Sequence, residues 1–341
     1  MVLFEITAHV LKKGLFASWI ARITNEEETQ LLYGVFAGIF WALETVTLSA
    51  ALKRASFPAA GAMAFVAPFI STFLHDLFSA VWIGGFNTIK GKPFGAFRAL
   101  GTKGGKRIAL AALAGGPVGM TGYVLAVNSL GSSLGAIASA VYPAIGAVLA
   151  YFVLKEKLQW YRWIFLLLTL CGVYGLSFTP GVEIENYLLG AVGALACAFG
   201  WGAEAVILAK GMGGGEVTHA FALQIRQSTS ASVYAAVLLP VFLIKRGAFT
   251  ETKFEQSFFA LIALAALCAT VSYLCYYRAI TSIGAAKAMA LNVTYSAWAV
   301  VFTVLICKDD SMLRPLPICC TVLVIVCGLL AGIDVRRKRD G

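Results

Sequence analysis

The feature that most constrains the fold of this chain is a series of long apolar runs. A helix of about 20 apolar residues is long enough to cross the hydrocarbon core of a bilayer. Ten runs of this kind follow one another, at about 33–52, 57–84, 106–127, 133–154, 160–178, 187–210, 217–244, 256–280, 284–306 and 315–334. The sequence therefore predicts an all-α integral membrane protein with ten transmembrane helices.

The overall composition agrees with this interpretation. Hydrophobic residues make up 60% of the chain and charged residues only 13%, whereas a soluble domain carries about 25% charged residues. The links between the apolar runs are mostly short, which favours antiparallel neighbouring helices. Ten helices in one bundle are typical of a transporter and do not fit a single-span receptor.

Residues 1–32 and 335–341 fall outside this pattern. The first segment mixes charges with apolar residues at helical spacing, and it lacks the apolar core and cleavage site of a signal peptide. We interpret it as an amphipathic extension lying on the cytoplasmic membrane surface, with a partly disordered segment as the alternative. The second segment is a basic tail, which we also place in the cytoplasm.

The net charge of +10 is unevenly distributed along the chain. If the chain starts inside, the inner segments hold 17 Lys and Arg residues and the outer loops hold seven. This asymmetry matches the positive-inside bias of membrane proteins. We therefore expect both termini in the cytoplasm, and we expect a lipid bilayer, not nucleic acid, beside the basic segments.

The chain also contains an internal repeat. The segment FWALETV at 40–46 matches GWGAEAV at 200–206 in its Trp and Glu, and 123–143 aligns with 276–296 through two Tyr and one Gly. These matches predict two five-helix halves, 33–178 and 187–334. Because each half has an odd number of spans, the two halves have opposite orientations, as in many secondary transporters whose substrate site lies between the repeats.

Two Trp–Glu pairs are candidates for the binding site: Trp41 with Glu44, and Trp201 with Glu204. A spacing of three residues places both members of a pair on one helix face. An ionisable side chain within a span usually faces the bundle interior and marks a functional site. The alternative is a structural glutamate hydrogen-bonded to a neighbouring helix.

A second group of aromatic and polar residues lies in the runs 256–280 and 284–306. It comprises Tyr273, Tyr276, Asn292, Tyr295 and Trp298. Helical spacing places several of these on common faces, and a hydroxyl or amide at this depth needs a polar partner. For Tyr276 and the tyrosine after it, the alternative is a place in the aromatic belt at the membrane interface.

Together these residues indicate the charge of the ligand. Trp and Tyr rings attract cations, and aromatic cages recognise quaternary ammonium groups. A nearby carboxylate would neutralise the bound cation. An amino acid or other anionic substrate would instead need a cationic partner, for which Arg226 is the one deep candidate.

A third group consists of candidate coupling or gating residues. His75 and Asp76 lie in one half, and Arg226 lies at a matching place in the other. The functional interpretation is gating or proton relay, with Glu44 as a further candidate, and the alternative is a buried ion pair of Arg226 with Asp76 or Glu204. Tyr142 precedes Pro143, which predicts a kink or hinge there.

No catalytic signature is present in the sequence. The chain has only three His residues, it has no Ser/His/Asp arrangement, and none of its eight Cys shows metal-ligand spacing. We therefore expect no enzyme activity, no metal site and no cofactor. A membrane enzyme would need a nucleophile or metal ligands that the sequence does not show.

Several motifs resemble a known family. Ten helices in two inverted halves resemble the drug/metabolite transporter superfamily, with each half similar to an EamA domain. Within it, the stretches CAFGWGAEAV (197–206), IRQ (225–227), SYLCYYRAI (272–280) and LNVTYSAW (291–298) resemble the bacterial LicB-type choline importers, as does 114–158.

That resemblance implies proton-coupled uptake of choline across the bacterial inner membrane by alternating access. It also implies an aromatic pocket for the ammonium group, with Glu204 as the counter-charge and Asn292 at the polar end of the ligand. The pocket residues carried over are Trp41, Trp201, Tyr273, Tyr276, Tyr295 and Trp298. An exporter of amino acids or aromatic metabolites from the same superfamily is the alternative.

Overall fold

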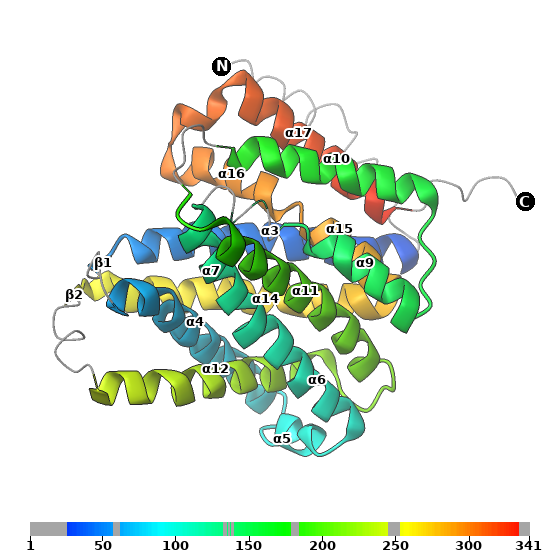
Figure 1. The fold of residues 1–341 in the computed structure, drawn as a ribbon. Helices are drawn as coiled ribbons and strands as arrows, with labels where there is room; N and C mark the ends of the chain where they lie inside the picture. Colours follow the sequence, from blue (N-terminus) through cyan, green and yellow to red (C-terminus); the bar gives the residue numbers. More distant parts are fainter. Residues whose placement is uncertain are drawn as a thin grey trace, which may run out of the picture.

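The computed structural model describes residues 26–56, 62–131, 135, 137, 140–178, 184–244 and 253–333, almost all of them helical (Figure 1). The first half contains α3 (Glu26–Leu52), α4 (Ala62–Ile89), α5 (Gly95–Leu100), α6 (Lys103–Leu113), the π-helical η1 (Ala114–Met120), α7 (Thr121–Leu130), α9 (Tyr142–Val153) and α10 (Trp160–Ser177). The second half contains α11 (Tyr187–Met212), α12 (His219–Ile244), α14 (Gln256–Ile283), α15 (Ala285–Asn292), α16 (Tyr295–Cys307), the short 3₁₀ turn η2 (Asp310–Leu313) and α17 (Pro315–Gly332).

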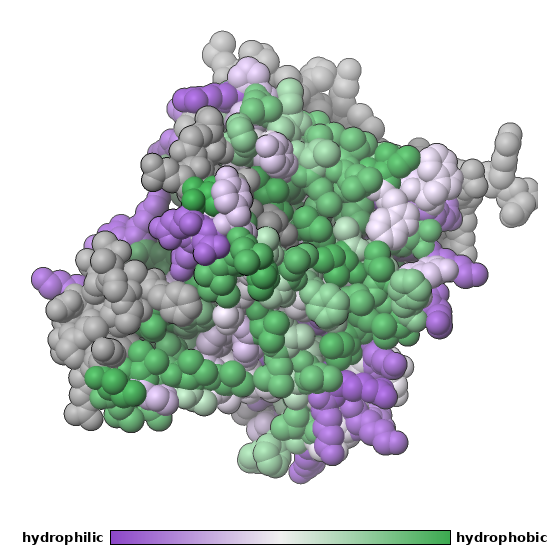
Figure 2. All heavy atoms as spheres, viewed as in Figure 1, coloured by the Kyte–Doolittle hydropathy of each residue, from purple (hydrophilic) through white to green (hydrophobic). Residues whose placement is uncertain are grey.

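The helices have the length and composition of membrane spans. Within the described residues, nine helical stretches are long and apolar enough to cross a bilayer, and α9 adds a shorter apolar helix of 12 residues. The chain is therefore a multi-pass membrane protein, as its ten apolar runs predict. The green apolar surface in Figure 2 extends over most of the face shown, as expected for helices that contact lipid.

Two predicted boundaries differ from the structure: the start of the first span, and the continuity of the run 284–306. Helix α3 begins at Glu26, so the last residues of the predicted extension 1–32 belong to the first helix. The acidic residues at 26–28 favour a helix N-terminus at this point. Residues 1–25 and the tail 335–341 lie outside the described residues. Tyr142, where the sequence predicts a kink or hinge, is the first residue of α9 and follows a turn at 140–141, and the proline after it costs no hydrogen bond there. The run 284–306 divides into α15 and α16.

Helices of the two halves pack against one another in pairs. Helix α3 packs along α14, α11 packs along η1 and α7, and α4 packs along α12. Helices α10 and α17 form a further pair at the top of Figure 1. Because the first helix of each half contacts the third span of the other, the centre of the bundle is built by both halves.

A small β-ladder joins the halves at one end of the bundle. Strand β1 (Ala55–Ser56) follows α3, and it pairs antiparallel with β2 (Lys253–Phe254), which precedes α14. The ladder lies at the left in Figure 1, and α5 lies at the bottom, beyond the end of α4 that is farther from the ladder. These two ends serve below as reference points for the two sides of the membrane.

Candidate functional site

A cavity of about 610 Å³ lies at the centre of the bundle. It contains every candidate site residue predicted from the sequence except one. Its lining includes Trp41, Glu44, His75, Asp76, Tyr142, Trp201, Glu204, Arg226, Tyr273, Tyr276, Asn292 and Tyr295. The two Trp–Glu pairs, the gating candidates and the aromatic group therefore belong to one site.

Arg226 of α12 is the centre of a buried ionic network. Its Nε donates a hydrogen bond to Oε1 of Glu204 at 2.8 Å, and its Nη1 lies 3.4 Å from Oδ2 of Asp76. Nη1 also donates to Oε1 of Gln227 at 2.7 Å. The predicted ion pair is therefore present, and it involves both of the acids that the sequence offered as alternatives.

The network continues through neutral groups into three helices. Nε2 of Gln227 donates to Oγ of Ser79 at 2.9 Å, and Ser79 shares a 2.8 Å hydrogen bond with Thr270. All three side chains are buried. This chain fixes the amide of Gln227, and it thereby holds the guanidinium of Arg226 in place.

A second ionic group joins α3 to α4. Nε2 of His75 lies 3.5 Å from Oε1 of Glu44, and its Nδ1 lies 3.1 Å from Oδ1 of Asp76. The other carboxylate oxygen of Glu44 accepts a hydrogen bond from Thr45 at 3.2 Å. His75 thus connects Glu44 to the carboxylate that also contacts Arg226, and the acids of both halves become one continuous chain.

The π-helical segment η1 makes room for Glu204 and Trp201. A Cβ atom on Gly115 would collide with the carboxylate of Glu204. The indole Nε1 of Trp201 donates to the Gly115 carbonyl at 3.1 Å. A π-turn frees backbone carbonyls from the regular helical pattern and is frequent at functional sites. Here it supplies both the space and the acceptor that the Trp–Glu pair needs.

Aromatic rings surround the rest of the cavity in two groups. The ring of Trp41 packs edge-on against Tyr273 at 5.0 Å and lies 6.1 Å from the ring of Tyr295. In the other group, Trp201 stacks on Tyr123 at 5.8 Å and meets Tyr142 edge-on at 5.9 Å. The guanidinium of Arg226 lies 5.0 Å above Tyr273, which shows that these rings already hold one cation.

Asn292 adds one polar group to this aromatic wall. Its Nδ2 donates to the hydroxyl of Tyr142 at 3.1 Å. Its buried Oδ1 accepts no hydrogen bond from the described residues. Such an acceptor costs free energy while it is unpaired, and a donor on a bound ligand would satisfy it.

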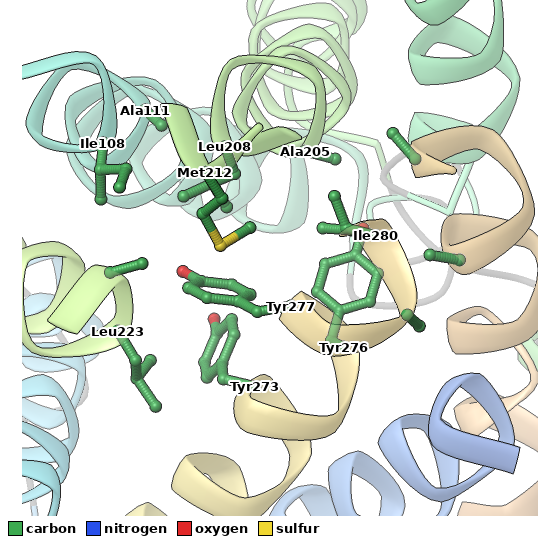
Figure 3. Close-up of a cluster of buried hydrophobic side chains, with 14 of the residues drawn as sticks. Ile108, Ala111, Ala205, Leu208, Met212, Leu223, Tyr273, Tyr276, Tyr277 and Ile280 are labelled. Carbon is green, nitrogen blue, oxygen red and sulfur yellow. The ribbon is translucent and has the colours of Figure 1, made fainter. Parts of the chain in front are cut away.

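Three tyrosines of α14 close the cavity on the side away from the β-ladder. Tyr276 and Tyr277 are buried, and they pack with Leu208, Met212 and neighbouring apolar residues in the cluster shown in Figure 3. The aromatic-belt alternative for these residues is therefore wrong, because neither ring reaches the bundle surface. The third tyrosine, Tyr273, lies at the edge of this cluster and lines the cavity.

Trp298 is the one predicted pocket residue that the structure does not bring to the cavity. Tyr295 lines the cavity from the first turn of α16, directly after the break between α15 and α16. Trp298 is half-buried one turn farther along, on a helix that packs against α3 and α17. Common helical spacing is not enough here, because the helix moves away from the cavity.

Sequence reasoning missed two aromatic contacts of the site. In the alignment of 123–143 with 276–296, Tyr123 is the repeat partner of Tyr276, and this match is the signal that could identify Tyr123 as a lining residue. Tyr234 donates to the carbonyl of Gly116 at 3.0 Å and thus supports η1. Nothing in the sequence around Tyr234 indicates that contact.

Comparisons with known proteins agree with this architecture. The EamA-like transporter family matches the chain twice, at residues 28–178 and 188–331. Protein LicB of Haemophilus influenzae is 28% identical over 310 residues, which cover 91% of this chain and 98% of LicB. A crystal structure of a protein with 16% sequence identity shares the fold, with a TM-score of 0.67 over 91% of this chain and 99% of that chain. The chain is therefore a member of the EamA-like transporter family.

Proposed function

We propose that this protein imports choline or a related quaternary ammonium compound across the bacterial inner membrane. The transport is coupled to protons and proceeds by alternating access. Membership of the transporter family and the similarity to LicB support the general class. The choice of a cation as substrate rests on the charges and rings of the cavity.

The excess of acids over free cations in the cavity is the observation that carries this proposal. Among the described residues that line it there are three carboxylates, from Glu44, Asp76 and Glu204, and Arg226 is the only Lys or Arg. Arg226 is already engaged by two of these acids and by an amide. A further positive charge fits this site better than a negative one, because an anion would have to displace buried partners of the arginine.

The shape of choline also fits the remaining groups. The rings around Trp41 and Trp201 present aromatic faces that suit a methylated ammonium group, which needs no hydrogen-bond acceptors. The unpaired Oδ1 of Asn292 suits the hydroxyl at the other end of the molecule. The proposal therefore assigns the cationic head to the rings and the alcohol to Asn292.

Equivalent contacts in the two halves support an inverted repeat around this site, as alternating access requires. The contact of Trp41 with Tyr295 has a counterpart in that of Trp201 with Tyr142, as the repeat predicts. The same holds for the backbone. Lys155 and Lys308 are the two non-glycine residues with positive φ in the described chain, and their separation equals that between the aligned segments 123–143 and 276–296. Together with the positive-inside bias, this arrangement supports the proposal that both termini lie in the cytoplasm.

The carboxylate of Glu204 is the proposed link between substrate and protons. It contacts Arg226, lines the cavity, and sits against η1, so its charge affects both ligand and helix packing. In the proposal, Glu204 either neutralises the choline cation or carries a proton in its place. Occupancy of the site then changes the interaction between α11 and α12.

Uptake of radiolabelled choline into proteoliposomes, with and without an inward proton gradient, tests the proposal. We expect gradient-stimulated uptake, and we expect Trp201→Ala to raise the KM about tenfold through loss of a desolvated cation–π contact. Trp160→Ala is the matched control, because Trp160 is 68% exposed and lies outside the cavity. Absence of choline uptake by the folded wild-type protein would contradict the proposal.

The exporter alternative makes a different prediction for Arg226. An amino-acid substrate needs a cationic partner for its carboxylate. Among the described residues that line the cavity, Arg226 is the only Lys or Arg. If amino-acid export is found and is lost in Arg226→Ala, that alternative replaces the importer.

A further inference from the structure

Residues 89–107 form a basic and aromatic segment at the end of the bundle away from the β-ladder (Figure 1). Helix α5 occupies its middle and connects α4 to α6. The small side chains of α5 face the protein, with Ala96 only 4% and Ala99 only 6% exposed. Most of the other side chains of the segment are exposed, and we call the face that they form the α5 surface.

The apolar part of the α5 surface is unusually exposed for the end of a span. Ile89 is 86% exposed, Phe94 is 67% exposed and Phe97 is 78% exposed. These side chains flank or belong to a short helix between two spans, at the level where chains leave the hydrocarbon core. Apolar rings at this level insert into the headgroup and acyl boundary of a bilayer.

The polar part of the α5 surface carries charge of one sign. Six basic residues are all exposed: Lys90, Lys92, Arg98, Lys103, Lys106 and Arg107. The segment 89–107 contains no Asp or Glu. Among the described residues, none of the six forms an ion pair with an acid. Figure 2 shows purple hydrophilic side chains gathered beside green ones at this lower end of the molecule.

The segment is held in a fixed place on the bundle. Gly95 of α5 lies directly against the ring of Phe221 on α12, where a Cβ atom would collide with it. Beside it, Asn87 donates to Oε1 of Gln224 at 2.7 Å. The basic and apolar groups are therefore presented by a structured element that is attached to α4 and α12.

We infer that the α5 surface binds anionic phospholipids of the leaflet in which it lies. Its charge is complementary to phosphate-bearing headgroups, and its rings occupy the adjoining acyl boundary. Each Lys or Arg near an anionic lipid surface strengthens association about fivefold. A soluble acidic partner would pair with the basic residues but would leave the rings of Phe94 and Phe97 in water. An anionic lipid contacts both the polar and the apolar part of the α5 surface.

Lipid selectivity tests the inference independently of any transport activity. The full chain is reconstituted in phosphatidylcholine vesicles, and its association with spin-labelled phosphatidylglycerol is compared with that of spin-labelled phosphatidylcholine. We expect a preference for the anionic lipid that falls severalfold in the double variant Lys92→Gln/Arg98→Gln. The matched control is Lys53→Gln/Lys253→Gln, which removes two exposed charges beside the β-ladder and should leave the preference unchanged.

A second variant distinguishes insertion of the phenylalanine rings into the bilayer from attraction by the basic residues alone. Phe94→Ser/Phe97→Ser keeps every basic residue, and we expect it also to lower the preference for the anionic lipid, because the rings no longer hold the segment in the boundary layer. Wild-type protein without preference, or equal preference in Lys92→Gln/Arg98→Gln and wild type, would overturn the inference. Full preference in the phenylalanine variant would overturn the insertion of the rings. Because choline uptake is not the readout, these outcomes stay separate from those of the transport test.

Discussion

At the scale of single residues, the site depends on a carboxylate that packs closely against a glycine. No side chain fits at the position of that glycine. Glu204 accepts the hydrogen bond from Arg226 while its carboxylate lies against Gly115. Any larger residue at position 115 would compete with the carboxylate for the same volume. The missing side chain of one glycine is thus as important to the ionic network as the charges themselves.

This contact predicts the effect of adding one methyl group. We expect Gly115→Ala to displace the carboxylate of Glu204 from Arg226 and to lower choline uptake at least about tenfold, because separating a buried ion pair is strongly unfavourable. The measurement is the initial uptake rate per folded protein in proteoliposomes. Gly85→Ala is the control, since a Cβ at Gly85 meets nothing within 4 Å. Equal rates in Gly115→Ala and wild type would contradict the assignment of Glu204.

Local spacing is enough to find most residues of the site, but not their contacts. Trp201 and Glu204 stand out because a carboxylate in an apolar run is rare, and a spacing of three puts both on one face. Their acceptor and neighbour, Gly115, lies 86 residues before Trp201 in the chain, and nothing local connects them. The ion pair of Arg226 could be predicted because so few partners for it exist within the spans.

At the scale of elements, the interruptions of helices matter more than the helices. The ten apolar runs are visible in the sequence because the bilayer sets their length. The π-helical η1 and the break between α15 and α16 are not, since both depend on packing against other spans. Both interruptions lie beside the cavity, and the second is the reason that Tyr295 lines the cavity and Trp298 does not.

Glu156 shows how such an interruption is stabilised. The carboxylate accepts hydrogen bonds from the backbone N–H groups of Ala285 and Ala286, at 2.8 and 3.0 Å, and so caps α15 from the link after α9. Gly284 precedes them with φ of 93°, a conformation that L side chains rarely adopt. This cap connects the two halves at the start of the interrupted span.

Loss of this cap should destabilise the protein measurably. We expect Glu156→Ala to lower the stability by about 1–2 kcal/mol, the usual range for a charged helix cap. Glu255→Ala should have an effect of less than about 1 kcal/mol, because Glu255 pairs with Arg54 at an exposed site. The apparent Tm of each purified variant in detergent gives the comparison. Equal Tm values for the two variants would show that the contact seen at α15 contributes nothing.

At the scale of the whole molecule, the cavity is open toward one end of the bundle. Its lining continues along Leu48, Ser49 and Leu52 in the last turns of α3, next to the β-ladder. In the opposite direction the tyrosines of α14 pack with Leu208 and Met212. The structure therefore has one side accessible and the other closed, as one of the two states of a transporter requires.

Chemical accessibility should show this difference between the two ends. In a background without the eight native cysteines, we expect Thr72→Cys to react with a membrane-impermeant thiol reagent added on the side of the β-ladder. Thr72 lines the cavity, whereas Leu208 is only 1% exposed, and we expect Leu208→Cys to resist. Added choline should slow the reaction at Thr72→Cys. Equal labelling of both positions from both sides would contradict a closed end.

The pairing of Asp76 with Arg226 also has a consequence for biosynthesis. The two residues are 150 positions apart, and they belong to different halves of the chain. At a translation rate of about 5–20 residues per second, the guanidinium is made roughly 8–30 s after the carboxylate. Helix α4 is thus synthesised before the arginine that pairs with Asp76 exists. Until α12 has been synthesised, Asp76 therefore has its contact with His75 but lacks its contact with the guanidinium of Arg226.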